Sequence, residues 1–410
     1  MKKLIFSTIL ATFTCCFQLS TFNSVAQTAY ITNGVDSNVS VINVATNTVI
    51  DSIPVGKGPN GVSVSQDGSK VYISNNLSNS ISVINTLTNT VIATIPVGSY
   101  PVGLSVSPDG SKVYVANNYD STISVINTAT NTVTATITVG PFPTGVIVSP
   151  DGNKVYVTIW GAFEISVINT SSNTVMDTIK GGWAPQSIVT SPDGSKIYVC
   201  NWGGNTVSVI NSTSDTILAT IAVGHRPYSL SVSPDGNMVY VANWSSNSVS
   251  VINTATDTIS ATIPVGINPR GVSVSPDGSK VYVANSGSNT VSVISSATNT
   301  VTDTIKVGSN PYAFGNFIST HITGIAPQSM EQADVNVYPC PNNGIFQISS
   351  IQYQATSIEI YNLLGEMVYN LPITDNCSPI TINLSDMPNG VYVVKVKTGK
   401  GTEIRKIIKE

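Results

Sequence analysis

One tyrosine recurs every 42 residues along most of this 410-residue chain. The seven tyrosines of the series are Tyr30, Tyr72, Tyr114, Tyr156, Tyr198, Tyr240 and Tyr282. An aspartate in the turn sequence SPDG, or SQDG in one copy, keeps the same period from Asp67 to Asp277. A repeat near forty residues with four β segments in each copy is typical of a β-propeller blade. The repeat therefore predicts an all-β chain whose copies form a ring.

A single copy divides into four strands. Residues 103–107 (GLSVS), 112–117 (KVYVAN), 122–127 (TISVIN) and 132–140 (TVTATITVG) supply strands A to D, and polar turns separate them. Pro-Asp-Gly in the A–B turn suits a type I turn followed by a left-handed glycine. Charged residues make up only 10% of the chain, whereas Gly, Ser, Thr, Asn, Val and Ile are abundant. That composition favours strands over long helices.

The two ends of the repeat region determine the number of blades. The first copy begins at Ala29 and Tyr30, already in strand B. The last copy completes strand D near Gly308 and continues as NPYAFGNFIS, residues 310–319, which has the pattern of strand A with no strand behind it. Since the missing strand and the surplus strand are the same one, residues 312–319 are expected to close the ring and hide both sheet edges. Counting then gives seven four-stranded blades.

The recurring tyrosine opens a four-residue motif. It is written YITN, YISN, YVAN or YVCN in six copies, at residues 30–33, 72–75, 114–117, 198–201, 240–243 and 282–285. These copies resemble the YVTN β-propeller repeat family, whereas residues 156–159 depart from it and read YVTI. The resemblance covers about residues 28–319 and implies the propeller fold. It selects no function, because the family includes surface-layer, periplasmic and enzyme-like proteins.

The pattern changes after about Val335. Alternating apolar and polar residues, with turns at PNNG, NLLGE and MPNG, predict a small immunoglobulin-like β-sandwich of about seven antiparallel strands. The segment contains YPCPNNG (338–344), IEIYNLLGE (358–366), LSDMPNGVYVVKV (384–396) and a closing basic run with Arg405, Lys406 and Lys409. It closely resembles the C-terminal sorting domain of type IX secretion substrates (Por secretion, type A). Members of that family usually have Asn where this chain has Cys340.

The resemblance of the tail implies export in two steps. A signal peptide carries the chain across the inner membrane of a Gram-negative bacterium. The type IX machinery then recognises residues 333–410 and carries the protein across the outer membrane. The tail is commonly cleaved, and the cargo is released or attached to surface lipopolysaccharide. The protein is therefore expected to be secreted or displayed on the outer cell surface.

The first 26 residues have the pattern of a secretory signal peptide. Lys2 and Lys3 precede an apolar run that ends in the small residues Ser24, Val25 and Ala26. A lipid anchor on one of the two adjacent cysteines, Cys15 and Cys16, is the alternative. The expected organisation is a signal peptide at residues 1–26, a propeller at 27–320, a linker at 321–332 and a sorting domain at 333–410.

Charge and cysteine content exclude several classes of partner. A net charge of −4 gives no electrostatic reason to expect nucleic acid or an anionic membrane surface. No segment after the signal peptide is long and apolar enough to span a bilayer. Removal of the signal peptide leaves Cys200, Cys340 and Cys377, and the last two are able to pair in an oxidising compartment. These thiols and the histidines His225 and His321 have no metal-binding spacing, so no metal or cofactor is expected.

The propeller contains no recognisable catalytic constellation. Most of its acidic residues lie in the SPDG turns or beside the outer strand. Glu164 and His225 would supply a general acid and base, but nothing in their spacing favours catalysis. No catalytic residue is assigned. Enzyme activity stays open, because some seven-bladed relatives are lyases or lactonases.

Antiparallel strands place the B–C and D–A loops of every blade on one face of the ring, and the copies differ most on this face. Trp160, Trp202 and Trp244 occupy one B–C position in three successive copies, and Trp183 lies in a D–A loop. Clustered rings beside Arg and His on a loop face commonly bind sugars or peptides. The predicted ligand-binding residues are Trp160, Phe163, Trp183, Trp202, His225, Arg226, Tyr228, Trp244 and Arg270.

Two interpretations of these rings stay open. In one, they cap the blade junctions and pack against the surrounding loops. Against it, the other four copies have Gly34, Asn76, Asn118 and Ser286 at the same position. In the other, which we favour, the chain is a secreted or cell-surface binding module for a glycan or an extracellular protein. A propeller lyase or lactonase and a structural surface-layer component are the alternatives.

Overall fold

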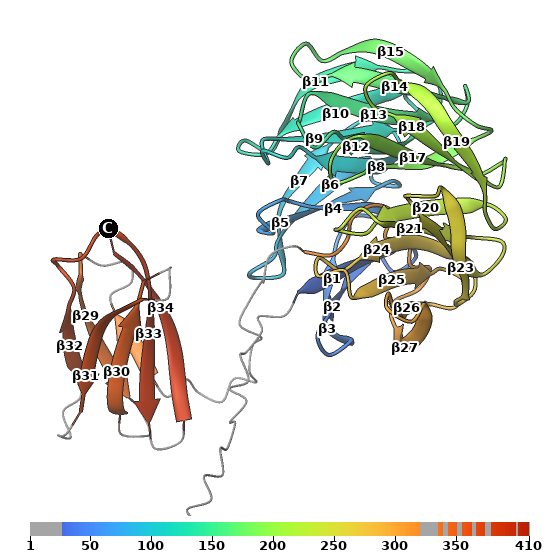
Figure 1. Ribbon diagram of the computed structural model, residues 1–410. Helices are drawn as coiled ribbons and strands as arrows, with labels where there is room; N and C mark the ends of the chain where they lie inside the picture. Colours follow the sequence, from blue (N-terminus) through green and yellow to red (C-terminus); the bar gives the residue numbers. More distant parts are fainter. Residues whose placement is uncertain are drawn as a thin grey trace, which may run out of the picture. The chain divides into compact units, whose positions relative to one another are not determined.

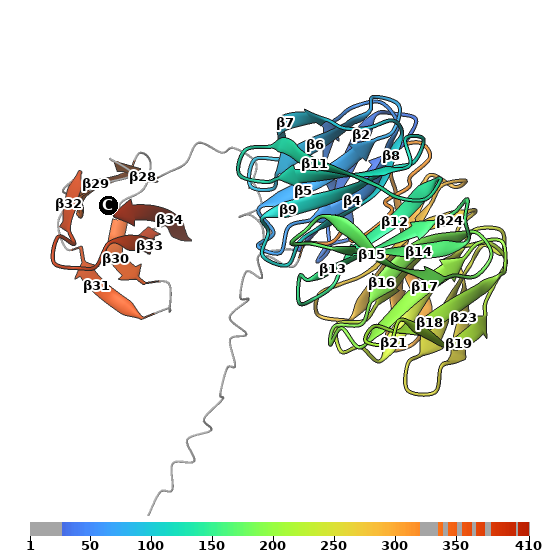
Figure 2. The ribbon, with the colours of Figure 1, turned by 90° about the horizontal axis from the view of Figure 1, so that it is seen from above.

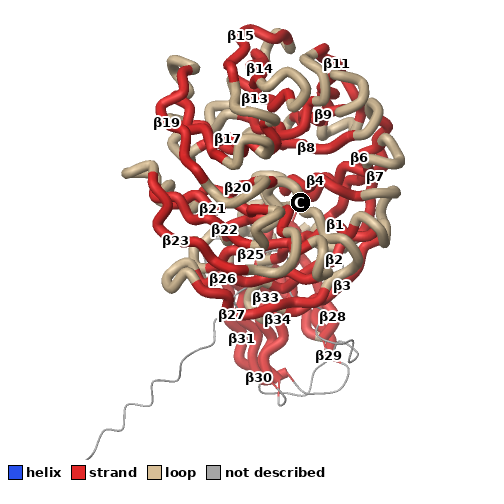
Figure 3. The backbone as a smooth tube through the Cα atoms, turned by 90° about the vertical axis from the view of Figure 1, so that its right-hand side faces the viewer, coloured by secondary structure: helices blue, strands red, loops and turns tan. Residues whose placement is uncertain are grey.

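The computed structural model of the chain describes residues 27–319, 335–338, 343–350, 355–362, 366–373, 379–398 and 401–409. These residues form strands, turns and loops, with no helix among them and hence none able to cross a membrane (Figure 3). The chain divides into two compact units, Met1–Ala326 and Pro327–Glu410. The predicted signal peptide, the predicted linker and the cysteines Cys340 and Cys377 lie outside the described residues.

Seven β-sheets follow one another along the first unit and form the blades of a propeller (Figures 1 and 2). Blade 1 contains β1 (Thr28–Asn33), β2 (Asn38–Asn43) and β3 (Thr48–Pro54). Blades 2 to 4 contain β4 (Pro59–Val64), β5 (Lys70–Asn75), β6 (Ser80–Asn85) and β7 (Thr90–Pro96); β8 (Pro101–Val106), β9 (Lys112–Asn117), β10 (Thr122–Asn127) and β11 (Thr132–Thr138); and β12 (Pro143–Val148), β13 (Lys154–Ile159), β14 (Glu164–Asn169) and β15 (Thr174–Lys180). Blades 5 to 7 contain β16 (Pro185–Thr190), β17 (Lys196–Asn201), β18 (Thr206–Asn211) and β19 (Thr216–Ala222); β20 (Pro227–Val232), β21 (Met238–Asn243), β22 (Ser248–Asn253) and β23 (Thr258–Pro264); and β24 (Pro269–Val274), β25 (Lys280–Asn285), β26 (Thr290–Ser295) and β27 (Thr300–Lys306). The predicted all-β, seven-bladed fold is confirmed.

The core lies between neighbouring sheets. The recurring tyrosine is at most 2% exposed in all seven blades. Tyr114 and Ala116 of blade 3 share a buried cluster with Val146 and Val155 of blade 4. The outer strand of each blade, by contrast, buries a single isoleucine, for example Ile95 in β7. Because one blade cannot bury its own two faces, the core is complete only when the ring is complete.

A lysine at the start of the second strand links each of five blades to the next blade. In each case its Nζ donates to a backbone carbonyl of the following C–D turn. The pairs are Lys70–Thr128 (3.2 Å), Lys112–Thr170 (3.0 Å), Lys154–Ser212 (3.1 Å), Lys196–Thr254 (2.9 Å) and Lys280–Val44 (2.8 Å). Blade 6 has Met238 at this position and blade 1 has Thr28, so neither has the lysine link.

Residues 311–319 complete blade 1, as predicted. They run antiparallel to β1, where Tyr312 N donates to Thr32 O and Tyr30 N donates to Phe317 O, each at 2.9 Å. Both ends of the propeller therefore belong to one blade. Its inner and outer strands come from opposite ends of the repeat region, which removes the open edge that β1 would otherwise present.

The middle of this closing segment departs from a regular strand. The carbonyl of Phe314 accepts a hydrogen bond from Val62 N of blade 2 at 3.0 Å. Gly315, with φ of 121°, allows the bend. The Phe314 side chain then lines a narrow cavity of about 90 Å³ on the ring axis, together with Gly103 and Leu230 of the inner strands.

The SPDG turn has the geometry that its sequence predicts. In blade 3, Ser107 Oγ donates to Asp109 Oδ1, and Ser111 N donates to the same oxygen at 3.1 Å. Gly110 follows with φ of 71°, a left-handed position that glycine adopts without strain. The hydrogen bond from Ser107, followed by those from Ser111, lowers the pKa of Asp109 to about 2. The turn aspartates are therefore structural.

The second unit is a β-sandwich of two sheets with a shared core. One sheet has the order β28 (Val335–Tyr338), β29 (Ile345–Ser350), β32 (Ile380–Asn383). The other has the order β31 (Met367–Pro372), β30 (Ala355–Tyr361), β33 (Gly390–Thr398), β34 (Gly401–Lys409). Phe346 of the first sheet and Val394 of the second belong to one buried cluster. Lys409, from the closing basic run, is only 6% exposed, and its Nζ donates to the carbonyls of Ser385 and Met387.

Candidate ligand-binding face

The two loops of each blade on the tryptophan-bearing face are paired by backbone hydrogen bonds. Trp160 N donates to Phe142 O at 3.1 Å, and Trp202 N donates to Ala184 O at 3.0 Å. The D–A loop that leads into a blade and the B–C turn of that blade therefore form one layer. Side chains from both loops meet on the same face, the one predicted from the sequence to bind a ligand.

Blade 4 lacks the asparagine of the YVTN-type motif and the hydrogen bonds that this side chain makes in other blades. In blade 3, Asn117 Nδ2 donates to Thr122 Oγ1 at 3.0 Å and to Ser124 Oγ at 2.9 Å, which ties β9 to β10. Blade 4 has Ile159 at this position, paired across the strands with Glu164. The sequence IWGAFE thus replaces a buried polar tie with an apolar contact. The backbone turn itself is kept.

Bulky side chains occupy left-handed backbone positions on this face. The φ angle is 55° at Tyr100, 57° at Phe142, 59° at Phe163 and 54° at Arg226. An ordinary L-residue in this conformation costs about 1–2 kcal/mol, and Gly or Asn, which several sister copies have here, costs less. Stability alone would favour Gly or Asn at these positions. Strained aromatic and arginine residues on a loop face therefore point to a function.

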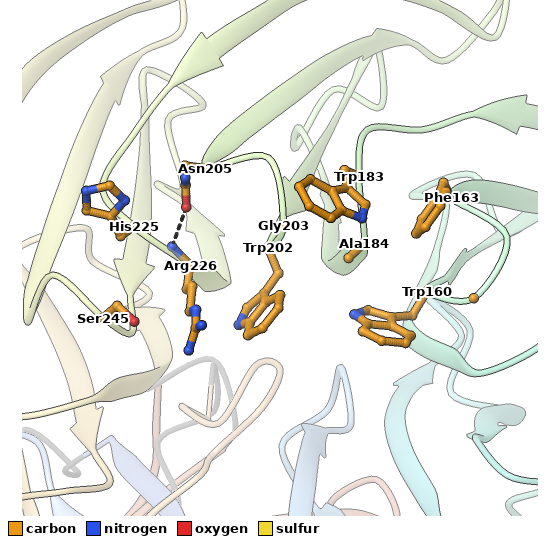
Figure 4. Close-up of a pocket in the computed structure, with 11 residues that line it drawn as sticks. Trp160, Phe163, Trp183, Ala184, Trp202, Gly203, Asn205, His225, Arg226 and Ser245 are labelled. Atoms are coloured by element: carbon orange, nitrogen blue, oxygen red, sulfur yellow. Dashed lines mark hydrogen bonds between the residues drawn. The ribbon is translucent and has the colours of Figure 1, made fainter.

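Six of the nine predicted residues line one pocket of about 760 Å³ (Figure 4). They are Trp160, Phe163, Trp183, Trp202, His225 and Arg226. Their loops belong to blades 4, 5 and 6, which adjoin one another. The rings of Trp183 and Trp202 lie at the centre of the row, with Trp160 and Phe163 on one side and the basic side chains on the other (Figure 4).

Trp183 lies against the B–C turn of blade 5 at Gly203. A Cβ atom at Gly203 would lie 3.0 Å from the Trp183 ring, so glycine lets the indole lie close to the backbone of the turn. The ring is still 64% exposed, compared with 46% for Phe163 and 38% for Trp160. Trp183 is therefore positioned by the fold while most of its surface stays in contact with solvent.

Arg226 borders the other end of the pocket. Its guanidinium lies 4.7 Å from the ring centre of Trp202 and 5.5 Å from that of Trp244. Its backbone N donates to Asn205 Oδ1 at 2.8 Å, the bond drawn in Figure 4. Cation–π contact with two indoles orients the arginine without neutralising its charge. No acidic side chain belongs to the described lining of this pocket.

Three predicted residues lie outside the pocket lining. Trp244 contacts Arg226, whose guanidinium carbon lies 5.5 Å from its ring centre. Tyr228 and Arg270 belong instead to a second cluster, in which the guanidinium lies 5.2 Å from the tyrosine ring. The nine residues predicted as one set are thus distributed over two clusters of side chains.

The smaller lining residues were not predicted from the sequence. They are Gly161, Ala184, Gly203, Asn205 and Ser245. Gly161 and Gly203 were visible as glycines at a B–C position where other copies have Val35, Leu77 or Tyr119. Glu164, the acid suggested as a partner for His225, does not line the pocket.

Known families match both parts of the chain. Residues 336–410 match the family described as secretion system C-terminal sorting domain. Within the propeller, residues 161–262 and 216–309 match the family described as lactonase, 7-bladed beta-propeller, and residues 18–110 match the YNCE-like beta-propeller family. The comparison with curated proteins found no match.

Solved structures agree on the fold. A chain of the Kuenenia stuttgartiensis hydrazine synthase structure is 25% identical, covers 65% of this chain and 92% of its own, and superposes with a TM-score of 0.61. Putative 6-phosphogluconolactonases from Bacteroides uniformis and Bacteroides fragilis are 21% and 20% identical, cover 70% and 72% of this chain and 98% of their own, and superpose with TM-scores of 0.60. The chain is a seven-bladed β-propeller that carries a C-terminal sorting domain of the type IX secretion system.

Proposed function

We propose that this exported propeller binds a glycan in the aromatic pocket of blades 4, 5 and 6. The observation that carries the proposal is the row of exposed rings around one cavity, with Trp183 the most exposed of them. Exposed rings keep apolar surface in water, and a ligand that covers them removes this surface from water, which favours binding. The C–H face of a sugar ring is a suitable cover for an indole.

The size of the pocket favours a glycan over a folded protein. A volume of about 760 Å³ lies within the range of roughly 300–1,000 Å³ that is typical of small-ligand sites. A stable protein partner would need about 800 Å² of surface on each side. Polar groups beside the rings suit sugar hydroxyls, because His225, Arg226 and Asn205 supply hydrogen-bonding atoms at the same cavity.

A glycan-array screen followed by calorimetry tests the proposal. Stacking contributes about 0.5–1.5 kcal/mol per ring, so the double change Trp183→Ala and Trp202→Ala should weaken binding of the best array ligand about 5- to 150-fold. Tyr119→Ala is a matched control, because Tyr119 is also 64% exposed but does not line the pocket. Affinity that stays within twofold in the double variant would refute the proposal. Binding to an extracellular protein alone, lost in the same variant, would reassign the ligand.

Sugar-lactone hydrolysis is a second candidate, favoured by the match of residues 161–309 to the seven-bladed lactonase family. His225 is the titratable side chain of the pocket best suited to proton transfer. The test is hydrolysis of 6-phosphogluconolactone, the substrate class named for two structural neighbours. A rate equal to the spontaneous rate, or one unchanged by His225→Ala, would reject this candidate.

We further propose display on the outer surface of a Gram-negative cell. The sorting domain supports export through the type IX machinery. Residues 333–410 fused behind a periplasmic reporter should carry it to the surface in a host with that machinery, and should leave it in the periplasm of a host without it. Retention of the reporter in both hosts would contradict the proposal.

A further inference from the structure

The second residue of each inner strand occupies an equivalent position around the ring axis. The seven residues are Asn60, Val102, Thr144, Gln186, Tyr228, Arg270 and Tyr312. The first four are at most 9% exposed. The last three are large, half-buried and adjacent, because they come from blades 6, 7 and 1. One sector of the ring thus has a tyrosine–arginine–tyrosine series where the others have small or uncharged side chains.

Arg270 lies between the two tyrosines. Its guanidinium carbon is 5.2 Å from the ring centre of Tyr228 and 4.0 Å from that of Tyr312. Its Nε donates to Ser286 Oγ at 3.1 Å, and Ser286 in turn donates to Asn268 O at 2.9 Å. These contacts hold the plane of the guanidinium between the two rings.

The arginine has no acidic partner in the described part of the chain. The ion pairs found there involve Lys154, Lys196 and Lys397. A half-buried guanidinium loses hydration and gains from an opposite charge, and its planar fork matches an oxyanion in a bidentate manner. The unpaired charge of Arg270 therefore favours an anionic ligand.

Further aromatic rings lie near the tyrosine–arginine–tyrosine series. Phe314 packs edge-to-face on Tyr228 with the ring centres 5.7 Å apart, and Tyr100 stacks on Tyr119 at 4.4 Å. Burial raises the pKa of Tyr228 to about 12, so its hydroxyl is a protonated donor at neutral pH. Burial, followed by the neighbouring Tyr119 and Tyr312, also raises the pKa of Tyr100, whereas Arg270 opposes the shift. Phenol donors thus share the surroundings of the guanidinium.

We propose that Arg270, flanked by Tyr228 and Tyr312, binds a carboxylate or sulfate group at the mouth of the ring axis. The guanidinium supplies the charge, and the flanking phenols orient it and add donors. None of these residues lines the aromatic pocket, so the site is independent of the glycan proposal. The structural alternative is that Arg270 only joins its own blade 7 to the neighbouring blades 6 and 1.

Calorimetric titration of the full chain at constant ionic strength tests the site. The probes are sodium sulfate, sodium acetate and glucuronate, with glucose as the neutral counterpart of glucuronate. We expect saturable binding of at least one anion and none of glucose at this site. Sulfate binding alone would identify a free-anion site, and preference for glucuronate would identify an acidic sugar as the source of the charge. Failure of the wild-type chain to bind any of the anions would overturn the proposal.

Three variants separate anion binding at Arg270 from a purely structural role. Arg270→Gln should weaken anion binding at least tenfold, and Arg270→Lys should weaken it less, because the charge is kept and the planar fork is lost. If Arg270→Gln fails to fold, Tyr312→Phe replaces it as the test. Loss of the phenol donor should weaken anion binding several-fold. Anion affinity that is unchanged in both Arg270→Lys and Tyr312→Phe would assign the series to ring packing.

Discussion

Replacing Phe163 with asparagine should weaken ligand binding without destabilising the propeller. Phe163 has φ of 59°, and the equivalent residues Asn205 and Asn247 have 55° and 52°. In those copies the Asn side chain also accepts a backbone hydrogen bond from the next blade, as Asn205 does from Arg226 at 2.8 Å. Phe163 offers no such oxygen to Ala184, which occupies the position of Arg226. Phe163→Asn restores the arrangement that the sister blades have.

The expected change in the free energy of unfolding is small and favourable. Relief of left-handed strain contributes about 0.5–1 kcal/mol, because Asn tolerates this conformation better than Phe. The regained hydrogen bond contributes about 0.5–1.5 kcal/mol. The lost burial offsets part of this gain. Full burial of a Phe side chain is worth about 1.5–3 kcal/mol, and Phe163 is 46% exposed, so about 1 kcal/mol is lost. The net change lies between about 0 and 1.5 kcal/mol in favour of the variant.

Denaturant melts and calorimetry with the glycan ligand supply the two readouts. Binding should weaken by roughly 2- to 13-fold, which corresponds to the stacking of one ring. Tyr100→Asn is a matched control, since Tyr100 also has a left-handed φ but lies outside the pocket lining. It should leave affinity unchanged. Destabilisation by more than about 2 kcal/mol in Phe163→Asn would show that the ring caps the blade junction, and would refute the reasoning.

Three further predictions concern the scaffold. A chain ended before Asn310 lacks the strand that completes blade 1, so it should aggregate or lose much of its stability; a monomer that melts normally would reject ring closure. The folded-state pKa of Asp109 is about 2, below the unfolded value of about 3.9. Its stabilising contribution is therefore present above pH 4 and lost as the pH falls towards 2, and Asp109→Asn should reduce the acid sensitivity of the melting temperature. Lys409→Met leaves two carbonyls of the sorting domain without their donor and should lower its stability by about 1–3 kcal/mol per unpaired group in thermal melts; an unchanged melt would contradict a structural role for this lysine.

The blades and their closure were predictable because every copy repeats the same local pattern. The alternation around Tyr114 and the glycine at Gly110 specify strands and turns within one copy, and long-range information is needed only for residues 311–319. The unmatched strands at the two ends supplied that information. The bend of the closing segment at Gly315 was not predictable, since it depends on the position of blade 2.

The membership of the pocket was harder to predict than its location. Trp160, Trp202 and Trp244 share one position in the repeat, yet Trp244 does not line the cavity. The pocket is lined instead by Trp183, from a D–A loop. Gly203 allows the Trp183 ring to lie against the B–C turn. Which side chains converge depends on contacts between neighbouring blades, and these are not encoded in the spacing of any single repeat.

Because blade 6 has Met238 where five other blades have a lysine, the junctions between blades are not all held by the same contact. Five junctions are fastened by a lysine, and the junction of blades 1 and 2 is fastened by Phe314 through Val62. The junction of blades 6 and 7 has neither fastening. This junction is held by other contacts: Asn268 N of blade 7 donates to Asn247 Oδ1 of blade 6 at 2.9 Å, and Arg270 of blade 7 lies against the ring of Tyr228 of blade 6. A ligand bound by Arg270 and Tyr228 would add a bridge between two blades that no lysine joins, so its binding should slow hydrogen exchange in the strands on both sides of this junction.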